Sequence, residues 1–504
     1  MIFNPTNLID AYKFGHMHQY PEGTEYVYSN FTPRGSRIEG IDKVVFLGLQ
    51  AFIDELTENY QENFFNQDID RIVAEFEQNT LEILGPNNVG SKHWRELHEL
   101  GYLPLKFQAL PEGYSVNLKI PMFTVENTDP RFFWLPNYIE SLLSASIWLA
   151  CTSATTAKRM RSLLVDWAEK TGSAVEGVDF QGHDFSFRGM GSLEEAAASG
   201  AGHLASFLGS DTIIAKEWIQ YHYGADEPVL LSVAATEHSV MCAGGNDEGE
   251  EQATYERLLN IYPSGIVSVV SDTWDLWNVL TVILPNLKDQ IMARDGKLVI
   301  RPDSGNPVDI LCGTNLGMEE TDDDLPASKG VIELLWDVFG GTVNEKGYKE
   351  LDSHIGAIYG DSITYERANE ICKRLEAKGF ASGNVVFGIG SFTYRYVTRD
   401  TFGFAMKATA VTINGKERAI YKKPVTDSGE KTSARGRMVV LAEIQEGKDS
   451  SSDNVEFALI DNLTKAEQDG YGDENWMQTV WENGNWVITT TFDQVRSRVR
   501  GELS

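Results

Sequence analysis

The sequence is poor in cysteine, and the cysteines that it has are widely scattered. Cys151, Cys242, Cys312 and Cys372 form no pair separated by only a few residues. Zinc sites and dithiol redox sites need such close pairs, so neither is expected here. We interpret all four as reduced, structural thiols of the kind found in reducing compartments.

Long apolar runs are also missing. The first residues, MIFNPTNLIDAY, have neither a basic start nor an extended apolar stretch. The most apolar helix-like run, residues 142–151, is too short to span a bilayer. The sequence therefore predicts a cytoplasmic protein without a membrane partner.

Positive charge is scarce. The 504 residues include 43 lysines and arginines against 74 aspartates and glutamates, which gives a net charge of −31. Such a surface repels nucleic-acid phosphates and anionic membranes, so neither is an expected partner. With 42% hydrophobic residues, a chain of this length can bury a large core and is expected to form two or three domains.

Two motifs that would indicate common nucleotide-binding folds are incomplete. GEKT at residues 429–432 lacks the opening glycine and the preceding buried strand of a P-loop, and FGIGS at 387–391 lacks the third glycine of GxGxxG. We interpret FGIGS as glycines that expose backbone amides to a phosphate. No repeat of fixed period is present, which disfavours a solenoid.

The middle of the chain repeats one pattern. An apolar strand ends in a glycine or a polar residue, and a helical pattern follows, after residues 267–270, 298–300, 357–359 and 385–387. Such βα units are typical of an α/β barrel, whose reactive groups lie at the carboxyl ends of the strands. Charged residues at these strand ends are therefore expected to share one site.

The flanking segments predict other elements. Residues 132–170 have the pattern of two long amphipathic helices, which we expect to connect two domains. Residues 402–413 and 485–492 read as strands.

Three strand ends carry carboxylates. In RPDSGNP, residues 301–307, Arg301 can grip a phosphate with its fixed fork of donors, and Asp303 can bind magnesium or sugar hydroxyls. Asp272 and Asp361 follow two other strands, so all three carboxylates could face one magnesium pyrophosphate or ribose. The alternative for each carboxylate is an ordinary helix N-cap.

Three further features stand out. HDFSFRG, residues 183–189, combines two aromatics with an arginine, which suits stacking of a flat ring beside an anion, although such aromatic pairs are more often core. His238 could be a base, a phosphate acceptor or a buried hydrogen-bonding residue. Residues 416–437 hold seven basic residues against three acidic ones, which favours an anion site over a solvated loop once RPDSGNP is considered.

A series of motifs along the chain resembles one family. The series runs through DAYKFGHMHQYP, FTVENTDP, HDFSFRG, GSDT, SVVSD, RPDSGNP, GDS and VTRD. In this order they closely resemble the nicotinamide phosphoribosyltransferases. The resemblance implies an irregular α/β barrel at residues 151–400 and a second mixed α+β domain built from both chain ends, residues 1–150 and 401–504. It also implies a homodimer whose active sites draw on both subunits.

The resemblance implies a role for each matching residue. The nicotinamide ring would contact Phe185, the partner subunit's Tyr12, Asp211, Arg188 and Asp10. The ribose and its 5′-phosphate would contact Gly360, Asp361, Gly390, Ser391, Arg399 and Lys407. Pyrophosphate or ATP would contact Arg301, Arg34, Lys422, Lys431, Ser232 and Ser268. Magnesium would be bound by Asp272 and Asp303, and His238 would be phosphorylated by ATP.

The implied reaction transfers phosphoribosyl from phosphoribosyl pyrophosphate to nicotinamide, in NAD biosynthesis, coupled to ATP hydrolysis and with Mg²⁺ as cofactor. One alternative is a nicotinate phosphoribosyltransferase, although Asp211 would repel nicotinate. The other is a non-catalytic nucleotide-binding protein on the same fold. Retention of Arg301, Asp303, Asp361 and His238 argues against that second alternative.

Overall fold

The computed structural model describes residues 3–245, 248–314, 325–422, 434–444 and 454–501. Contacts between residues divide the chain into two compact units. Unit 1 comprises residues 1–155, 218–227 and 397–504, and unit 2 comprises residues 156–217 and 228–396. None of the helices in the described ranges combines the length and the apolar composition that crossing a bilayer requires.

Unit 2 is built around a parallel sheet. Its strands lie in the order β6 (Gly182–Asp184), β13 (Val385–Ile389), β12 (Ile355–Tyr359), β9 (Leu298–Arg301), β8 (Val267–Val270) and β7 (Ala234–Ala235). β8 and β12 are buried along their whole length, which explains why parallel strands read as continuous apolar runs. All four strands predicted from the βα pattern are therefore confirmed.

Isolated bridges extend this sheet into a ring. Beyond β6, Asp184 pairs in parallel with Ser210, and Gly209 pairs with Leu231, which shortly precedes β7. The ring of strands thus returns to β7 at its other edge, as in an irregular barrel. The predicted fold class is confirmed.

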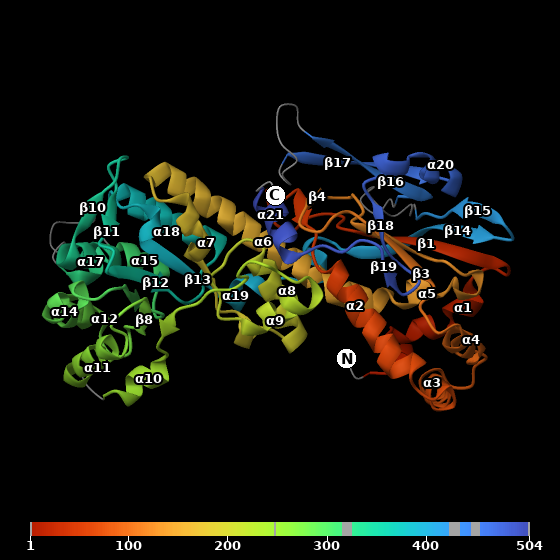
Figure 1. Ribbon diagram of the computed structural model, residues 1–504, viewed down its shortest axis with the longest axis horizontal. Helices are drawn as coiled ribbons and strands as arrows, with labels where there is room; N and C mark the ends of the chain where they lie inside the picture. Colours follow the sequence, from red (N-terminus) through yellow and green to blue (C-terminus); the bar gives the residue numbers. More distant parts are fainter. Residues whose placement is uncertain (1–2, 246–247, 315–324, 423–433, 445–453, 502–504) are drawn as a thin grey trace. The chain divides into compact units, whose positions relative to one another are not determined.

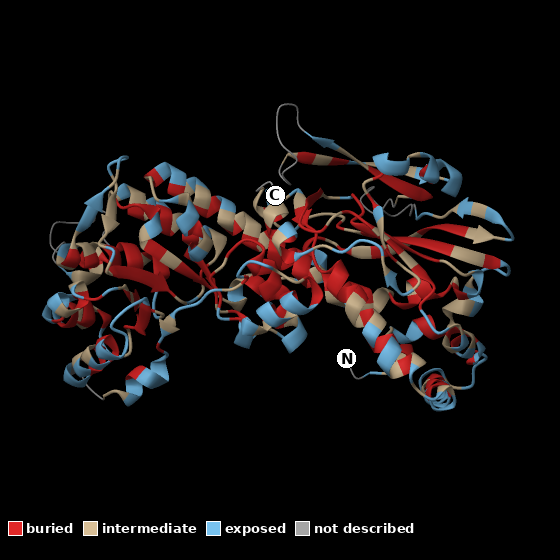
Figure 2. Ribbon diagram, viewed as in Figure 1, coloured by how far each residue is buried: buried red, intermediate tan, exposed pale blue. Residues whose placement is uncertain are grey.

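Helices precede, separate and follow the strands of unit 2 along the chain, and Figure 1 shows α15, α17 and α18 beside β12 and β13. They are α7 (Val178–Gln181), α8 (Leu193–Leu204), α9 (Ile213–His222), α10 (His238–Ala243), α11 (Glu248–Ile261), α12 (Leu276–Asn278), α13 (Leu284–Asn286), α14 (Lys288–Met292), α15 (Pro307–Cys312), α16 (Pro326–Lys329), α17 (Val331–Phe339), α18 (Tyr365–Ala377) and α19 (Ser391–Tyr394). A hairpin of β10 (Gly341–Val343) and β11 (Lys349–Leu351) follows α17. Figure 2 shows the strands buried and the outer faces of α11 and α14 exposed.

Unit 1 contains an antiparallel sheet that joins both ends of the chain. Its strand order is β15 (Lys416–Ala419), β14 (Ala405–Ile413), β1 (Thr24–Thr32), β5 (Phe123–Asn127), β3 (Leu105–Ala109), β18 (Gln478–Glu482) and β19 (Asn485–Trp486). β1 from the start of the chain pairs with β14 from its end. A mixed domain built from both chain ends is therefore confirmed.

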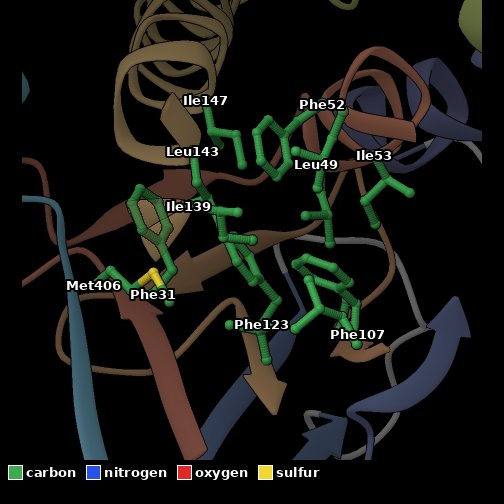
Figure 3. Close-up of a cluster of buried hydrophobic side chains, with 14 of the residues drawn as sticks. Phe31, Leu49, Phe52, Ile53, Phe107, Phe123, Ile139, Leu143, Ile147 and Met406 are labelled. Atoms are coloured by element: carbon green, nitrogen blue, oxygen red, sulfur yellow. The ribbon is translucent and has the colours of Figure 1, made fainter. Parts of the chain in front are cut away.

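The other elements of unit 1 surround this sheet. Two further strand pairs are β2 (Lys43–Val45) with β4 (Ser115–Asn117) and β16 (Arg437–Ile444) with β17 (Val455–Leu463). The helices are α1 (His16–Gln19), α2 (Leu49–Tyr60), α3 (Ile69–Leu84), α4 (Lys92–Leu100), α5 (Leu135–Tyr138), the first half of α6, α20 (Lys465–Gly470) and α21 (Phe492–Arg500). Figure 3 shows side chains of α6 and α2 converging on strand residues Phe31, Phe107 and Phe123.

Two expectations about the flanking segments are wrong. Residues 140–171 form one continuous helix, α6 (Glu140–Thr171), because no glycine or proline interrupts them. Residues 485–492 form a strand only at Asn485–Trp486, because Thr491 caps helix α21 in a capping box with Gln494.

Candidate active site

The predicted site residues of unit 2 lie at the carboxyl ends of its parallel strands. Arg301 ends β9, Asp272 follows β8, and Gly360 with Asp361 follows β12. Gly390 and Ser391 follow β13, while Phe185 follows β6, and Asp211 and Ser232 follow the bridged residues 210 and 231. His238 begins α10, just after β7. The parallel sheet therefore collects these residues at one end of the strands.

Two glycines allow residues of this group to approach one another closely. A Cβ atom at Gly360 would lie 2.2 Å from Oδ1 of Asp303, and one at Gly388 would lie 2.9 Å from Cδ2 of Phe185. Neither gap could hold even a methyl group. The ends of β9, β12, β13 and β6 consequently lie in van der Waals contact around Phe185 and Asp303.

Asp272 holds the loop that carries Asp303. Its Oδ2 atom accepts the backbone N–H of Asp303 at 2.9 Å and that of Ser304 at 2.7 Å. Burial alone would raise the pKa of Asp272, but hydrogen bonds from Ser304 and Asp303 outweigh it, so the pKa lies below its ordinary value. Asp272 is therefore an ionised anchor between β8 and the RPDSGNP loop.

The three strand-end carboxylates are not the helix caps. Asn306 caps α15, Asp275 caps α12 and Thr364 caps α18, each by accepting a backbone N–H. The carboxylate of Asp361 accepts the hydroxyl of its neighbour Ser362, and it is exposed. Since other residues provide the caps, the capping alternative does not account for these carboxylates.

Arg301 forms a fork with a carboxylate and stacks on an aromatic ring. Its Nε and Nη2 atoms each lie 3.1 Å from one oxygen of Asp303. Its guanidinium carbon stands 4.7 Å from the centre of the Phe185 ring. A cation and a flat apolar surface thus adjoin, as a site for a pyridine next to pyrophosphate requires.

The base end of the site contains Asp211, His183 and Ser232. Nε2 of His183 lies 3.1 Å from Oδ1 of Asp211, and the hydroxyl of Ser232 donates to the same oxygen. Burial opposes ionisation of Asp211, yet these hydrogen bonds and the charge of Arg301 lower its pKa. In the described part of the chain, the hydrogen bonds to the Asp211 side chain come from His183 and Ser232 and not from a backbone N–H, and the N–H of Thr212 is accepted by Ser210.

His238 is half exposed beside Asp272. Its Nε2 atom lies 3.3 Å from Oδ1 of Asp272, a buried oxygen that accepts no hydrogen bond from the described residues. Ser268, on β8, is also buried, and its hydroxyl has no hydrogen-bond partner in the described part of the chain. Ser391 begins α19, and Arg188 lies exposed in the turn Phe187–Gly189.

Asp272 and Asp303 could hold a metal ion only together with other ligands. Across the described residues, no group of three or more His, Cys, Asp or Glu is arranged to bind a metal. Magnesium, however, usually takes one or two carboxylates and completes its shell with water and substrate phosphates. The buried free oxygen of Asp272 fits that arrangement.

The remaining predicted residues lie in unit 1. Tyr12 is 62% exposed, and the pKa of its hydroxyl is raised by burial and by Asp10 and Glu140, while Arg399 lowers it. The pKa of Lys407 is lowered by burial and, to a smaller extent, by the nearby charges of Arg34 and Lys422. Lys431 lies outside the described residues. Unit 1 therefore presents a cationic cluster of Arg34, Lys407 and Lys422.

His183 is the site residue that sequence reasoning did not single out. It is the central residue of β6 and the first residue of HDFSFRG, and its only signal in the sequence was its place in this motif, two positions before Phe185. Its partner Asp211 is distant in sequence but follows the adjacent bridge in the sheet.

Comparisons with known proteins agree with this geometry. The model of the nicotinate phosphoribosyltransferase family matches residues 180–480, and that of the N-terminal domain of nicotinamide phosphoribosyltransferase matches residues 6–83. A protein from Acinetobacter baylyi named nicotinamide phosphoribosyltransferase is 49% identical over 99% of this chain and 98% of its own. One of the same name from Mycoplasma genitalium is 36% identical over 86% of this chain and 96% of its own.

Solved structures share the fold at low identity. A nicotinate-nucleotide pyrophosphorylase from Pyrococcus furiosus superposes with a TM-score of 0.57 at 14% identity, covering 99% of this chain and 94% of its own. Human nicotinic acid phosphoribosyltransferase superposes with a TM-score of 0.55 at 14% identity, covering 98% of this chain and 93% of its own. The sequence matches along nearly the whole chain place it among the nicotinamide phosphoribosyltransferases, within the nicotinate phosphoribosyltransferase family.

Proposed function

We propose that this protein transfers the phosphoribosyl group of phosphoribosyl pyrophosphate to nicotinamide, which yields nicotinamide mononucleotide and pyrophosphate for NAD biosynthesis. The relatives that match along the chain carry this activity in their names. One observation supports it most directly: at the carboxyl ends of strands of one sheet, Phe185 lies against Arg301, which also pairs with Asp303 and whose charge acts on Asp211. A flat base and a pyrophosphate can thus be bound side by side.

In the proposed reaction, the pyridine nitrogen attacks C1 of the ribose while the bond from C1 to the pyrophosphate oxygen breaks. Pyrophosphate leaves with the electron pair, so negative charge grows on its oxygens. Arg301 would help to stabilise that charge with its positive charge and with the donors that do not bind Asp303. The ring of Phe185 would orient the base, which replaces a random encounter by a positioned one.

Asp211 selects the base in this proposal. Its carboxylate is ionised and can accept the N–H of a carboxamide, whereas it repels the carboxylate of nicotinate. The family and fold comparisons include proteins named for nicotinate. The charge of Asp211 is the feature that favours nicotinamide over that alternative.

Asp272 and Asp303 would hold a magnesium ion against the pyrophosphate. The ion would neutralise part of the leaving charge. Oδ1 of Asp272, which accepts no hydrogen bond from the described residues and has Nε2 of His238 at 3.3 Å, would face the ion, while Oδ2 fixes the Asp303 loop. Gly360 leaves room for the side chain of Asp303. Asp361, the residue after Gly360, would bind the ribose hydroxyls.

His238 is proposed to couple ATP hydrolysis to the transfer. Its imidazole is half exposed, and Asp272 lies on its Nε2 side. A carboxylate there favours a proton on Nε2, which leaves the lone pair on Nδ1 to take the γ-phosphoryl group as ADP departs. Water would later hydrolyse the phosphohistidine.

The active form is proposed to be a homodimer with shared sites. Two features of unit 1 support this proposal. The exposed ring of Tyr12 is suited to stack on the base, and the cationic cluster of Arg34, Lys407 and Lys422 is suited to bind phosphates. In the partner's site they would complete the base and phosphate contacts, together with Asp10 and Arg399.

A direct assay tests the proposed function. Purified protein is incubated with phosphoribosyl pyrophosphate, Mg²⁺ and either nicotinamide or nicotinate, and the mononucleotide product is quantified. Nicotinamide mononucleotide should form with the higher kcat/KM. A preference for nicotinate would assign the alternative activity, and no product with either base, with or without ATP, would indicate a non-catalytic protein.

A further inference from the structure

One oxygen of Asp211 receives two hydrogen bonds from the protein. Nε2 of His183 lies 3.1 Å from Oδ1, and the hydroxyl of Ser232 donates to that same atom. The other oxygen, Oδ2, accepts none from the described residues. The carboxylate is thus divided into one oxygen bound by the protein and one left open, on a side chain that is 43% exposed.

The proton between His183 and Asp211 belongs to the histidine. An ionised carboxylate can only accept hydrogen bonds, and the pKa of Asp211 is lowered despite its burial. Nε2 of His183 must therefore carry the proton, whether the ring is neutral or charged. His183 is consequently a donor to Asp211 and is not available as a base at this atom.

The His183 ring is held in place on several sides. It is 9% exposed, it belongs to β6, and its centroid lies 4.7 Å from that of Phe185. On the side of Nδ1, a Cβ atom at Gly209 would come within 2.9 Å, so only glycine leaves room there. The ring therefore has one position from which its donor meets Asp211.

We propose that His183 is a positioning residue for base selection: together with Ser232 it occupies Oδ1 of Asp211, so that Oδ2 alone is left to accept the carboxamide N–H of nicotinamide. This inference rests on the proposed function and deepens it. His183 acts through Asp211 and through its contact with Phe185. The choice of base would then depend on two segments that the bridge between Asp184 and Ser210 holds together: β6, which carries His183, and the segment that carries Asp211.

The proposal predicts which substitution alters selectivity. His183→Leu replaces the imidazole by an apolar side chain of similar size and removes the N–H donor to Asp211. The carboxylate of Asp211 then loses part of its fixed orientation. The kcat/KM for nicotinamide should fall about tenfold, mainly through KM, as expected for loss of one hydrogen bond to a charged group. Nicotinate has no donor for Asp211, so its kcat/KM should fall much less. The ratio of kcat/KM for nicotinamide to that for nicotinate therefore decreases.

A conservative variant and a matched control sharpen the test. In His183→Gln the amide Nε2 can replace the imidazole donor, and most of the preference should return. His354→Leu removes another histidine of unit 2 whose Nδ1 lies 2.7 Å from a carboxylate, that of Asp352, but at the opposite end of β12. That control should leave the preference unchanged.

A double variant separates positioning from general damage to the fold. If His183 acts through Asp211, adding His183→Leu to Asp211→Asn should change the ratio of kcat/KM values by less than twofold. In wild-type Asp211 the same substitution should change the ratio about tenfold. Thermal midpoints of all variants check that the proteins are folded.

The outcomes distinguish this inference from the function on which it rests. Formation of nicotinamide mononucleotide by the wild type tests the proposed function alone. Given that activity, an equal loss with both bases in His183→Leu, or no recovery in His183→Gln, would overturn the positioning role. An unfolded His183→Leu variant leaves the decision to His183→Gln, whose ratio must stay within about threefold of wild type for the inference to hold.

Discussion

The Nε2 atom of His238 lies 3.3 Å from Oδ1 of Asp272, whose other oxygen anchors the loop after β9. One carboxylate therefore connects the proposed phosphohistidine to the proposed pyrophosphate site. The histidine side chain is 49% exposed and the aspartate side chain 6%. The exposed ring can meet ATP, while its buried partner stays in place.

The first prediction concerns His238. His238→Ala should lose ATP hydrolysis and the stimulation of transfer by ATP, because no imidazole remains to accept the phosphoryl group. Measurable transfer without ATP should persist, since Arg301 and Asp211 are untouched. Both activities are measured in the same preparation, with His354→Ala as the control histidine. Undiminished ATP stimulation in His238→Ala would rule out the coupling role.

The second prediction concerns the stability that Asp272 supplies. Its pKa in the folded state lies below the ordinary value of 3.8, so its contribution is present above that pH and is lost as the pH falls through the folded pKa. Asp272→Asn replaces two hydrogen bonds to a charged oxygen by neutral ones, which should cost about 1 to 2 kcal/mol at pH 7.

The measurement is denaturant unfolding of wild type and Asp272→Asn at pH 7 and at about pH 2, which is below the ordinary pKa of 3.8. The difference between the two free energies of unfolding should be smaller at the lower pH. Asp337→Asn serves as control, because Asp337 pairs with Lys329 at the surface at 2.7 Å and such pairs contribute little. A difference for Asp272→Asn that grows on acidification would contradict the role assigned to the charge.

The third prediction concerns the close approach at Gly360. A methyl group there would lie 2.2 Å from Oδ1 of Asp303 and 2.8 Å from Nε of Arg301, so both side chains must move. Displacement of this order should reduce kcat/KM for phosphoribosyl pyrophosphate roughly a hundredfold. Gly177→Ala is the control, since a Cβ atom at Gly177 meets nothing within 4 Å. Equal activity of the two variants would show that the gap is not needed.

The fourth prediction concerns the shared sites of the proposed dimer. Tyr12→Ala and Asp303→Ala chains should each be inactive alone. Mixed dimers would contain one site without either lesion, so activity should partly return after subunit exchange. Exchange is confirmed by isolating heterodimers through two different affinity tags. Isolated heterodimers without activity would mean that each site is built within one subunit.

The sequence by itself determined much of the barrel. A buried parallel strand is typically a short continuous apolar run, and the strands at 267–270, 298–301, 355–359 and 385–389 contain such runs, each ending at a glycine or a polar residue. Their order along the chain also placed Asp272, Arg301 and Asp361 at strand ends. Local patterns sufficed here because a continuous apolar run and the residue that ends it can be read from neighbouring positions in the sequence.

Only the tertiary structure decided which side chains meet. The pairing of His183 with Asp211 depends on two strand ends that a bridge brings together, and Gly360 and Gly388 matter because of backbones that are distant in sequence. The same holds for the caps: Asn306 and Thr364 cap helices that Asp303 and Asp361 could have capped. A sequence lists the donors and acceptors, but the packing of separate strands sets the distances that select among them.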